Sequence, residues 1–346
     1  MPLRVLIVGA GMIAQGAHIP NLLRLGVEVE GLVEVNPQRA KEVAQRFGIQ
    51  RVWHDYRVAL KESLADAVVV ATPTKFHYGV TIEALRVGKH VLCEKPPAMS
   101  SAEAYEMANE AERRNLTLMW GFHLRFRDDA LSAKWAIDNG ELGDVYFVRA
   151  RWVRSRGAPA GWFCRKDLAG GGPLFDIGSH IIDLGWWLLG KPKMEGVYGY
   201  GFSKIGAKGV DLTRGHQPAD VRDGIDLKVI YDVEDYAGGL ITFEGGKVML
   251  YEVSWLLNDR DDFKVAVCGT NMGLSFPPLE FYMNGGAVYD GKDEGEAHFR
   301  LAEEFVRGIL HGQSEIKVGA VGWDGYEVMV ILERASQFLN QKGGHP

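Results

Sequence analysis

Short apolar runs alternate with amphipathic stretches through the first 120 residues of the chain. The runs have the length of strands that are buried on both faces, and they lie at 3–8, 27–35, 67–71, 90–93 and 117–120. The stretches between them that show helical periodicity include 38–47, 76–87 and 101–114. Strand–helix alternation at this spacing predicts right-handed βαβ units and a doubly wound parallel sheet.

The pattern changes near Asp144, where alternation of apolar and polar positions replaces the continuous runs. Strands are predicted at 145–154, 194–202, 226–232, 238–243, 247–255 and 263–268. Turns such as 244–246 join neighbouring strands, which indicates mostly antiparallel pairing. Helices are predicted at 296–311 and 323–339, and a long loop at 203–224. This half is predicted to form an α+β domain with a large open sheet.

Length, charge and cysteine usage narrow the class of protein. The 346 residues suit two domains, and the net charge of −6 without a basic cluster argues against a dedicated nucleic-acid binder. The three cysteines are widely spaced, which argues against a disulfide framework or a structural zinc site. No apolar stretch reaches the ~18–20 residues of a membrane span, and no signal-like segment opens the chain. We expect a soluble cytoplasmic protein that binds neither membrane nor nucleic acid.

Glycine is enriched, with 43 residues, and two glycines follow the first predicted strand directly. Gly9 permits a tight strand-to-helix turn, Gly11 lets the backbone approach a pyrophosphate, and Ala14 lets the helix pack close to the strand. The free N–H groups at the start of the helix then face the phosphates. The pattern predicts a Rossmann dinucleotide-binding domain at 1–122 and a second domain at 123–346, with the last helix able to pack back on the first domain.

Glu34 ends the second predicted strand, about 20 residues after the glycine pair, where an acid binds the adenosine ribose hydroxyls. Its carboxylate would repel a 2′-phosphate, so NAD is the expected cofactor. Arg39 is close enough in sequence to reach a 2′-phosphate, which leaves NADP as the alternative.

Two further motifs fall just beyond the carboxyl ends of predicted parallel strands, which is where ligands bind in open α/β sheets. One contains Thr72 and Pro73, and the other contains Glu94 and Lys95. His77 is also expected to line this edge, with an exposed helix position as its alternative. The expected cofactor contacts are Gly9, Gly11, Met12, Ile13, Glu34, Thr72, Pro73, His77, Glu94 and Lys95.

Together these motifs resemble the Gfo/Idh/MocA family of oxidoreductases over nearly the whole chain. The resemblance is carried by GAGMIA, ATPTKFH, CEKP, GFHLRF and GGGPLFDIGSHIID at 9–14, 71–77, 93–96, 121–126 and 170–183. It implies a catalytic trio of Lys95, Asp176 and His180, and association through the C-terminal sheet as a homodimer or homotetramer. The chain departs from the family at His123, where an asparagine is usual.

The residues of this trio have chemical properties that suit alcohol oxidation. Asp176 and His180 are four positions apart and would share one face of a helix. Histidine exchanges protons near neutral pH, so His180 is the expected general acid/base. Lys95 would stabilise negative charge on the substrate oxygen, and Asp176 would orient His180 or bind a neighbouring hydroxyl. The alternative is that Asp176 caps a helix and His180 is a packed helix histidine.

Three further side chains are expected to contact the substrate. His123 and Arg125 follow the last strand of the first domain, where an exposed hinge is the alternative role. Trp162 could stack on a sugar ring, or could pack in the core. No metal is expected, because one carboxylate and one imidazole are too few ligands for a closed site.

The sequence therefore predicts an NAD(P)-dependent oxidoreductase that oxidises a secondary alcohol of a sugar, a sugar derivative or a cyclitol. One alternative is a glycosidase that retains its NAD and cleaves by transient oxidation and elimination. Another is a ligand-sensing regulator on the same fold, against which the intact Lys95, Asp176 and His180 argue, because a sensor needs no general base.

Overall fold

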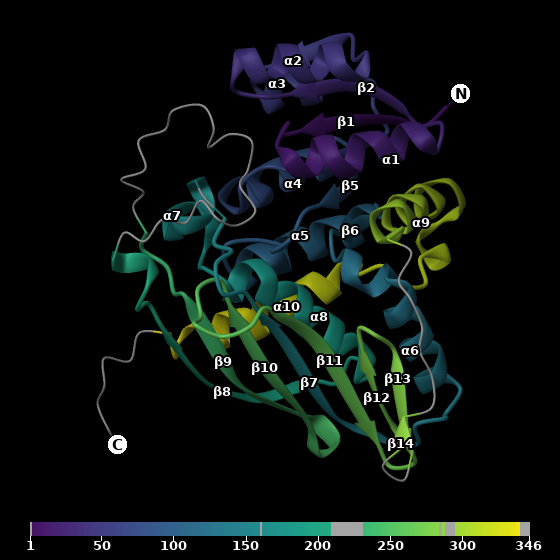
Figure 1. Ribbon diagram of the computed structural model, residues 1–346. Coiled ribbons are helices and arrows are strands. Elements are labelled where there is room, and N and C mark those ends of the chain that lie inside the picture. The colour runs from purple at the N-terminus through teal and green to yellow at the C-terminus, as the bar shows by residue number, and fades with distance from the viewer. Residues whose placement is uncertain (1, 160, 209–230, 284–285, 288–294, 340–346) are drawn as a thin grey trace. The chain divides into compact units, whose positions relative to one another are not determined.

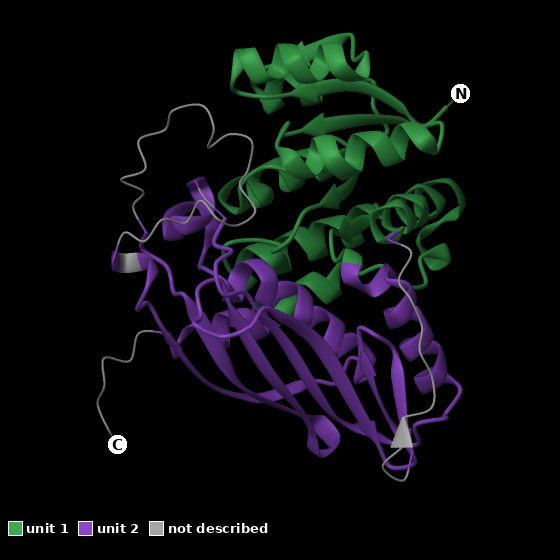
Figure 2. Cartoon of the chain, in the orientation of Figure 1, with its two compact units in different colours: residues 1–123, 296–329 green, residues 124–295, 330–346 purple. Residues whose placement is uncertain are grey.

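The chain forms two compact units in the computed structural model, which describes residues 2–159, 161–208, 231–283, 286–287 and 295–339. The first unit comprises residues 1–123 and 296–329, and the second comprises residues 124–295 and 330–346 (Figure 2). The sequence division into 1–122 and 123–346 allowed the last helix to pack back on the first domain, and the structure assigns the longer segment 296–329 to the first unit. This segment is held by backbone pairing, because Trp120 N donates to Ala320 O over 2.9 Å and Met119 pairs with Val321.

The first unit is built on a parallel sheet, as predicted, and this sheet has six strands in the order β3-β2-β1-β4-β5-β6 (Figure 1). Its strands are β1 (Arg4–Val8), β2 (Glu28–Val33), β3 (Arg51–Trp53), β4 (Ala67–Val70), β5 (His90–Cys93) and β6 (Leu118–Trp120). Its helices are η1 (Ala14–His18), α1 (Ile19–Arg24), α2 (Pro37–Phe47), α3 (Tyr56–Glu62), α4 (His77–Arg86), α5 (Ser101–Arg114) and α9 (Ala297–His311); α10 (Trp323–Ser336) begins in this unit and ends in the second. Every residue of β4 is buried, which explains its continuous apolar run.

Local signals fix the ends of several helices where the sequence placed them. Asn36 caps α2 by accepting a hydrogen bond from Arg39 N, and Pro37 occupies its first turn. Gly48 ends α2 in the left-handed region, with a φ of 70°. Strand β3 and helix α3 were not predicted from the sequence. The strand has three half-buried residues and the helix about two turns, and both are too short to show a hydrophobic periodicity.

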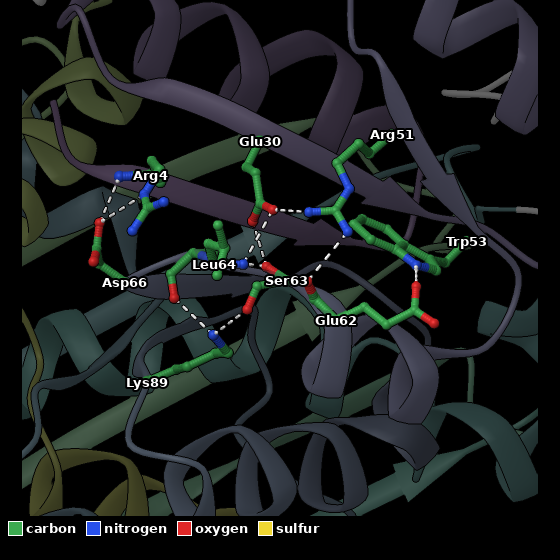
Figure 3. Close-up of polar contacts among 10 residues, drawn as sticks. Arg4, Glu30, Arg51, Trp53, Glu62, Ser63, Leu64, Asp66 and Lys89 are labelled. Carbon is green, nitrogen blue, oxygen red and sulfur yellow. Dashed lines mark hydrogen bonds and ion pairs between the residues drawn. The ribbon is translucent and has the colours of Figure 1, made fainter. Parts of the chain in front are cut away.

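A polar network ties β2 to the loops that precede β4 and β5 (Figure 3). The carboxylate of Glu30 accepts hydrogen bonds from Ser63 Oγ, from Leu64 N over 3.1 Å and from Arg51. Lys89 donates through Nζ to Ser63 O over 3.2 Å and to Ala65 O over 2.7 Å. Burial lowers the pKa of Lys89, but these two carbonyl groups satisfy its ammonium. The network orders the amino end of the sheet, opposite the edge where parallel sheets bind ligands.

The second unit contains an eight-stranded sheet in the order β14-β13-β12-β11-β7-β10-β9-β8. The pairing is antiparallel, as predicted, except between β7 and β10. The strands are β7 (Val145–Val153), β8 (Met194–Phe202), β9 (Tyr236–Phe243), β10 (Lys247–Ser254), β11 (Asp262–Gly269), β12 (Gly273–Phe276), β13 (Glu280–Met283) and β14 (Gly286–Ala287). Residues 226–230 of the strand predicted at 226–232, and the predicted loop from residue 209 onward, lie outside the described residues.

The helices of the second unit are α6 (Asp128–Asp138), α7 (Lys166–Ala169), the π-helical turn η5 (Leu174–Gly178) and α8 (Ser179–Leu188). Helix α8 packs on one face of the sheet, where Met249, Tyr251 and Val253 of β10 are buried as their alternation predicted (Figure 1). Contact is close at Gly185, where an added Cβ would lie 2.5 Å from Met249 Sδ. Among the described residues, no helix is both long and apolar enough to cross a bilayer.

Candidate active site

The carboxyl ends of the parallel strands are linked by a row of backbone hydrogen bonds. Gly9 N donates to Val33 O, Ala71 N to Val8 O, Glu94 N to Val70 O and Gly121 N to Cys93 O, over 2.8–2.9 Å. Each of these bonds joins the end of one strand to the loop that follows the neighbouring strand of the sheet. The glycine turn, the ATPTKFH loop and the CEKP loop therefore form one continuous edge.

The two glycines of the first turn have different structural roles. Gly9 has a φ of +98°, and an added Cβ would lie 2.5 Å from Ala71 O, so only glycine fits between the first and fourth strands. Gly11 has no protein atom closer than 4.0 Å to its hypothetical Cβ. Its lack of a side chain leaves open space beside the start of the helix, where Met12 and Ile13 begin the first helical turn. That space suits a pyrophosphate.

Glu34 is buried and lies against this turn. Its Oε2 accepts a hydrogen bond from Ala10 N over 3.0 Å, and its Oε1 accepts one from Asn36 N over 2.9 Å. The Arg39 Nη1 atom lies 3.8 Å from the same carboxylate. A negative charge thus stands at the end of β2, beside the glycine turn, where a dinucleotide would place its adenosine ribose.

The ATPTKFH loop presents two hydroxyl groups at this edge. Thr72 Oγ1 and Thr74 Oγ1 are buried, and within the described chain neither has a hydrogen-bond partner. Buried hydroxyls without partners are costly, so they fit a site that receives a polar ligand. With the open space at Gly11 and the acid at Glu34, the edge fits NAD.

His77 connects two of these loops from inside the protein. Its ring nitrogens lie 2.9 Å from Thr72 O and 2.9 Å from Pro96 O, and burial lowers the pKa of the imidazole. The side chain was expected to line the cofactor edge or to sit on a helix surface. The helix-surface alternative does not hold, because the side chain is buried, and its two contacts tie the ATPTKFH loop to the CEKP loop.

Asp176 and His180 lie in consecutive turns of the second unit. Asp176 belongs to the π-helical turn η5, in which Gly178 N donates to Pro173 O over 2.7 Å, and His180 is in the first turn of α8. Asp176 Oδ2 accepts a hydrogen bond from Trp255 Nε1 over 3.1 Å. Neither helix has a side-chain cap from Asp176, so the capping role considered from the sequence is not observed. π-helical turns are rare and concentrate at functional sites.

The glycines before Asp176 are required by packing. An added Cβ at Gly172 would lie 2.4 Å from Glu234 O, and one at Gly171 would lie 2.5 Å from the Phe175 ring. The carboxylate of Glu234 accepts hydrogen bonds from Gly172 N over 2.9 Å and from Leu174 N over 3.0 Å, and burial raises its pKa. Glu234 was not predicted from the sequence, because no motif marks a side chain that accepts hydrogen bonds from backbone N–H groups some 60 residues away.

The three expected substrate contacts have defined neighbours. Arg125 is fully buried and paired with Asp183, which favours a structural role over substrate contact. His123 stacks on His298 with ring centroids 3.9 Å apart, within the first unit. Trp162 stacks on Phe163 at the same centroid separation and is half-buried, so part of its surface faces solvent.

The predicted site residues are divided between the two units. The first unit brings the cofactor residues and Lys95 to one sheet edge, and the second unit brings Asp176 and His180 together. In the part of the chain that the structure describes, no group of three or more His, Cys, Asp or Glu side chains is arranged to hold a metal ion.

Comparisons with known proteins agree with this assignment of units. Residues 3–122 match the model of an oxidoreductase family with an NAD-binding Rossmann fold, and residues 130–275 match the GFO/IDH/MocA C-terminal domain. The D-glucoside 3-dehydrogenase of Escherichia coli (strain K12) is 34% identical over 341 residues, covering 96% of this chain and 93% of that protein.

Two solved structures share the complete architecture. One is GenD2 from gentamicin A biosynthesis in complex with NAD, with 26% identity, a TM-score of 0.79, and coverage of 97% of this chain and 94% of that one. The other is levoglucosan dehydrogenase in complex with NADH and levoglucosan, with 24% identity, a TM-score of 0.83, and coverage of 98% and 97%. The chain belongs to the Gfo/Idh/MocA family of oxidoreductases and binds NAD through its Rossmann unit.

Proposed function

We propose that this protein is an NAD-dependent dehydrogenase that oxidises a secondary hydroxyl of a sugar, specifically the C3 hydroxyl of a D-glucoside. The observation that carries the proposal is the pair of Asp176 and buried His180 in consecutive turns, in a chain whose other unit has an NAD edge ending in Lys95. The substrate class is supported by the 34% identity, over nearly the whole chain, to a D-glucoside 3-dehydrogenase.

His180 removes the hydroxyl proton while the carbon loses a hydride, so the alcohol becomes a ketone. NAD, when bound, supplies the hydride acceptor. Lys95 hydrogen-bonds the same oxygen and stabilises the negative charge that develops on it. Asp176, held by Trp255, orients the imidazole or binds the neighbouring hydroxyl.

A substrate panel tests this function. NADH formation is followed by its absorbance with alkyl D-glucosides, free glucose, levoglucosan and inositols, and the position of the new ketone is found by NMR. We expect the highest kcat/KM with glucosides and a 3-keto product. Release of the aglycone without net NADH would identify the NAD-retaining glycosidase instead. Binding of sugar with no turnover of any kind would support the regulator.

The assignment of His180 has its own test. We expect His180→Asn to lower kcat about 10²–10⁴-fold, as the loss of a general base does, with NADH affinity unchanged. The matched control is His311→Asn, which changes an exposed histidine at the end of α9. An active His180→Asn enzyme would refute the proposed role.

We also propose that the enzyme forms a homodimer or homotetramer through the outer face of the eight-stranded sheet. Tyr198 and Tyr200 point to the face opposite the buried Met249 and Tyr251, and they are 61% and 58% exposed. Tyr198→Glu is expected to shift the mass measured by light scattering towards the monomer. Tyr105→Glu, at an exposed tyrosine of the first unit, is the control.

A further inference from the structure

His18 ends the π-helical turn η1 that follows the glycine turn. The turn is defined by a five-residue backbone step, in which Ile19 N donates to Ala14 O. This wide turn shifts the following side chains by one position relative to an ordinary helix. His18 is buried at the end of this turn, with only 3% of its surface exposed.

The partner of His18 is Glu94, the first residue of the EKP sequence. His18 Nε2 lies 2.8 Å from Glu94 Oε1, and both side chains are buried. Burial by itself would raise the pKa of Glu94, but the hydrogen bond and charge of His18, with Lys95 and His298, lower it to about 2. Glu94 is therefore an anion throughout the neutral range, and it needs a hydrogen-bond donor opposite it.

The second oxygen of Glu94 holds the next residue of the chain. Glu94 Oε2 accepts a hydrogen bond from Lys95 N over 3.1 Å. One carboxylate thus connects the helix after the glycine turn to the backbone of Lys95. The position of that backbone decides where the lysine side chain starts.

Residues of neighbouring segments lie close to the carboxylate of Glu94. An added Cβ at Gly121 would lie 2.9–3.0 Å from the carboxylate atoms of Glu94, so residue 121 must be small. His298, at the start of α9, contributes a further imidazole whose pKa is lowered by burial and by His18 but raised by Glu94. The carboxylate is therefore bonded by His18 of η1, closely approached by Gly121 just after β6, and within electrostatic reach of His298 of α9, all within the first unit.

We propose that His18 is a positioning residue for Lys95, which it holds in place for the reaction through Glu94. The inference rests on the proposed function, because it assigns a purpose to the position of Lys95. It adds a residue that acts on Lys95 through the carboxylate of Glu94. It also implies that the helix that begins the cofactor site sets the geometry of the lysine.

The test compares two substitutions at His18 that differ in one property. Glutamine can donate a hydrogen bond to Glu94 Oε1, whereas leucine cannot. We expect His18→Leu to lower kcat at least tenfold with KM for sugar changed less than threefold, and His18→Gln to recover most of kcat. His311→Leu is the control for replacing a histidine of the same unit, because that side chain is exposed.

A double-mutant cycle with Lys95→Met identifies the route of the effect. If His18 acts through Lys95, His18→Leu should lower the residual kcat of the Lys95→Met enzyme less than twofold. The rate at which acetic anhydride labels Lys95 in the NAD-free protein gives a readout independent of activity. We expect that rate to change severalfold in His18→Leu and to return to normal in His18→Gln.

The outcomes separate this inference from the proposed function. An unchanged kcat in Lys95→Met would refute the role of Lys95 in the proposed function. A large loss in Lys95→Met combined with a fully additive loss from His18→Leu would overturn the positioning role alone. A fall in melting temperature for His18→Leu, with kcat and Lys95 labelling unchanged, would also overturn it and show that His18 only stabilises the fold.

Discussion

Arg125 and Asp183 form a bidentate ion pair that solvent does not reach. Arg125 Nε lies 2.9 Å from Asp183 Oδ2, Arg125 Nη2 lies 2.6 Å from Asp183 Oδ1, and both side chains are 0% exposed. Asp183 is one turn after His180 on α8, and Arg125 lies in the segment that opens the second unit. The pair therefore anchors the helix that carries the proposed general base.

Breaking this ion pair should lower the stability of the second unit. We expect Arg125→Met or Asp183→Asn to lower the free energy of unfolding by about 3–5 kcal/mol, because each leaves a buried charge or donor without its partner. Urea denaturation measures the loss. The double variant Arg125→Met with Asp183→Leu should recover much of it, since neither charge then remains buried.

An exposed pair gives the contrast. Arg165 and Asp167 form an ion pair in which the side chains are 45% and 51% exposed, and Arg165→Ala should change stability by less than about 1 kcal/mol. A stable Arg125→Met protein whose only defect is a raised KM would instead support the substrate contact expected from the sequence.

The glycine turn should respond differently at each of its two glycines. Gly9→Ala should destabilise the protein by more than about 1 kcal/mol, because its φ of +98° and the contact with Ala71 O exclude a side chain. Gly11→Ala should leave stability nearly unchanged but weaken NADH binding, because its Cβ would occupy space that no protein atom uses. Thermal unfolding and NADH fluorescence titration separate the two effects.

Gly16 is the control for both substitutions. It is exposed, with no atom within 4 Å of a hypothetical Cβ. Gly16→Ala should keep NADH affinity and leave stability unchanged or raised by about 0.5–1 kcal/mol. Equal NADH affinity in Gly11→Ala and Gly16→Ala would contradict the assignment of Gly11 to the pyrophosphate.

Glu34 should control the choice between NAD and NADP. Its carboxylate would repel a 2′-phosphate, so Glu34→Gln should lower the ratio of kcat/KM for NAD over NADP about tenfold or more. The amide keeps an oxygen to accept from Ala10 N or Asn36 N, which limits damage to the turn. Glu42→Gln, at an exposed acid of α2, should leave the ratio unchanged.

Glu94 should contribute to the acid sensitivity of the fold. Its pKa is lowered to about 2 in the folded protein from 4.5, so its stabilising effect is complete above about pH 4.5 and is lost as the pH falls towards 2. The loss is on the order of 3–4 kcal/mol, at about 1.4 kcal/mol per pH unit. In Glu94→Gln the free energy of unfolding should vary less with pH over this interval, whereas Glu112→Gln, at an exposed acid, should follow the wild-type curve.

Most of the first unit could be predicted from the sequence because its signals are local. The buried strand β4 is a continuous apolar run, Asn36 and Pro37 mark the start of α2, and Gly48 marks its end. Strands β12 and β13 were missed because each has four residues and gains its partners only from the assembled sheet.

The residues of the candidate site also fall into those that a local pattern identifies and those that only contacts distant in sequence identify. Gly9, Glu34 and Lys95 could be named because each lies within two residues of the end of a strand, and parallel strands bring their carboxyl ends to one edge. The contacts that Arg125 and His77 make in the folded protein could not be named from the sequence. Their partners, Asp183 and the carbonyl groups of Thr72 and Pro96, are identified by packing in three dimensions rather than by spacing.

The sequence alone determined the fold class, the NAD edge and the family, since hydrophobic period, turn glycines and short motifs are properties of neighbouring residues. Which charged groups are buried, and which groups satisfy them, depends on the packing of the folded chain. That packing pairs His18 with Glu94 across 76 residues and Gly172 with Glu234 across 62. A buried polar group needs a hydrogen-bond partner, and that partner can come from any part of the folded chain. The sequence separation between the two partners therefore cannot be predicted from a local pattern.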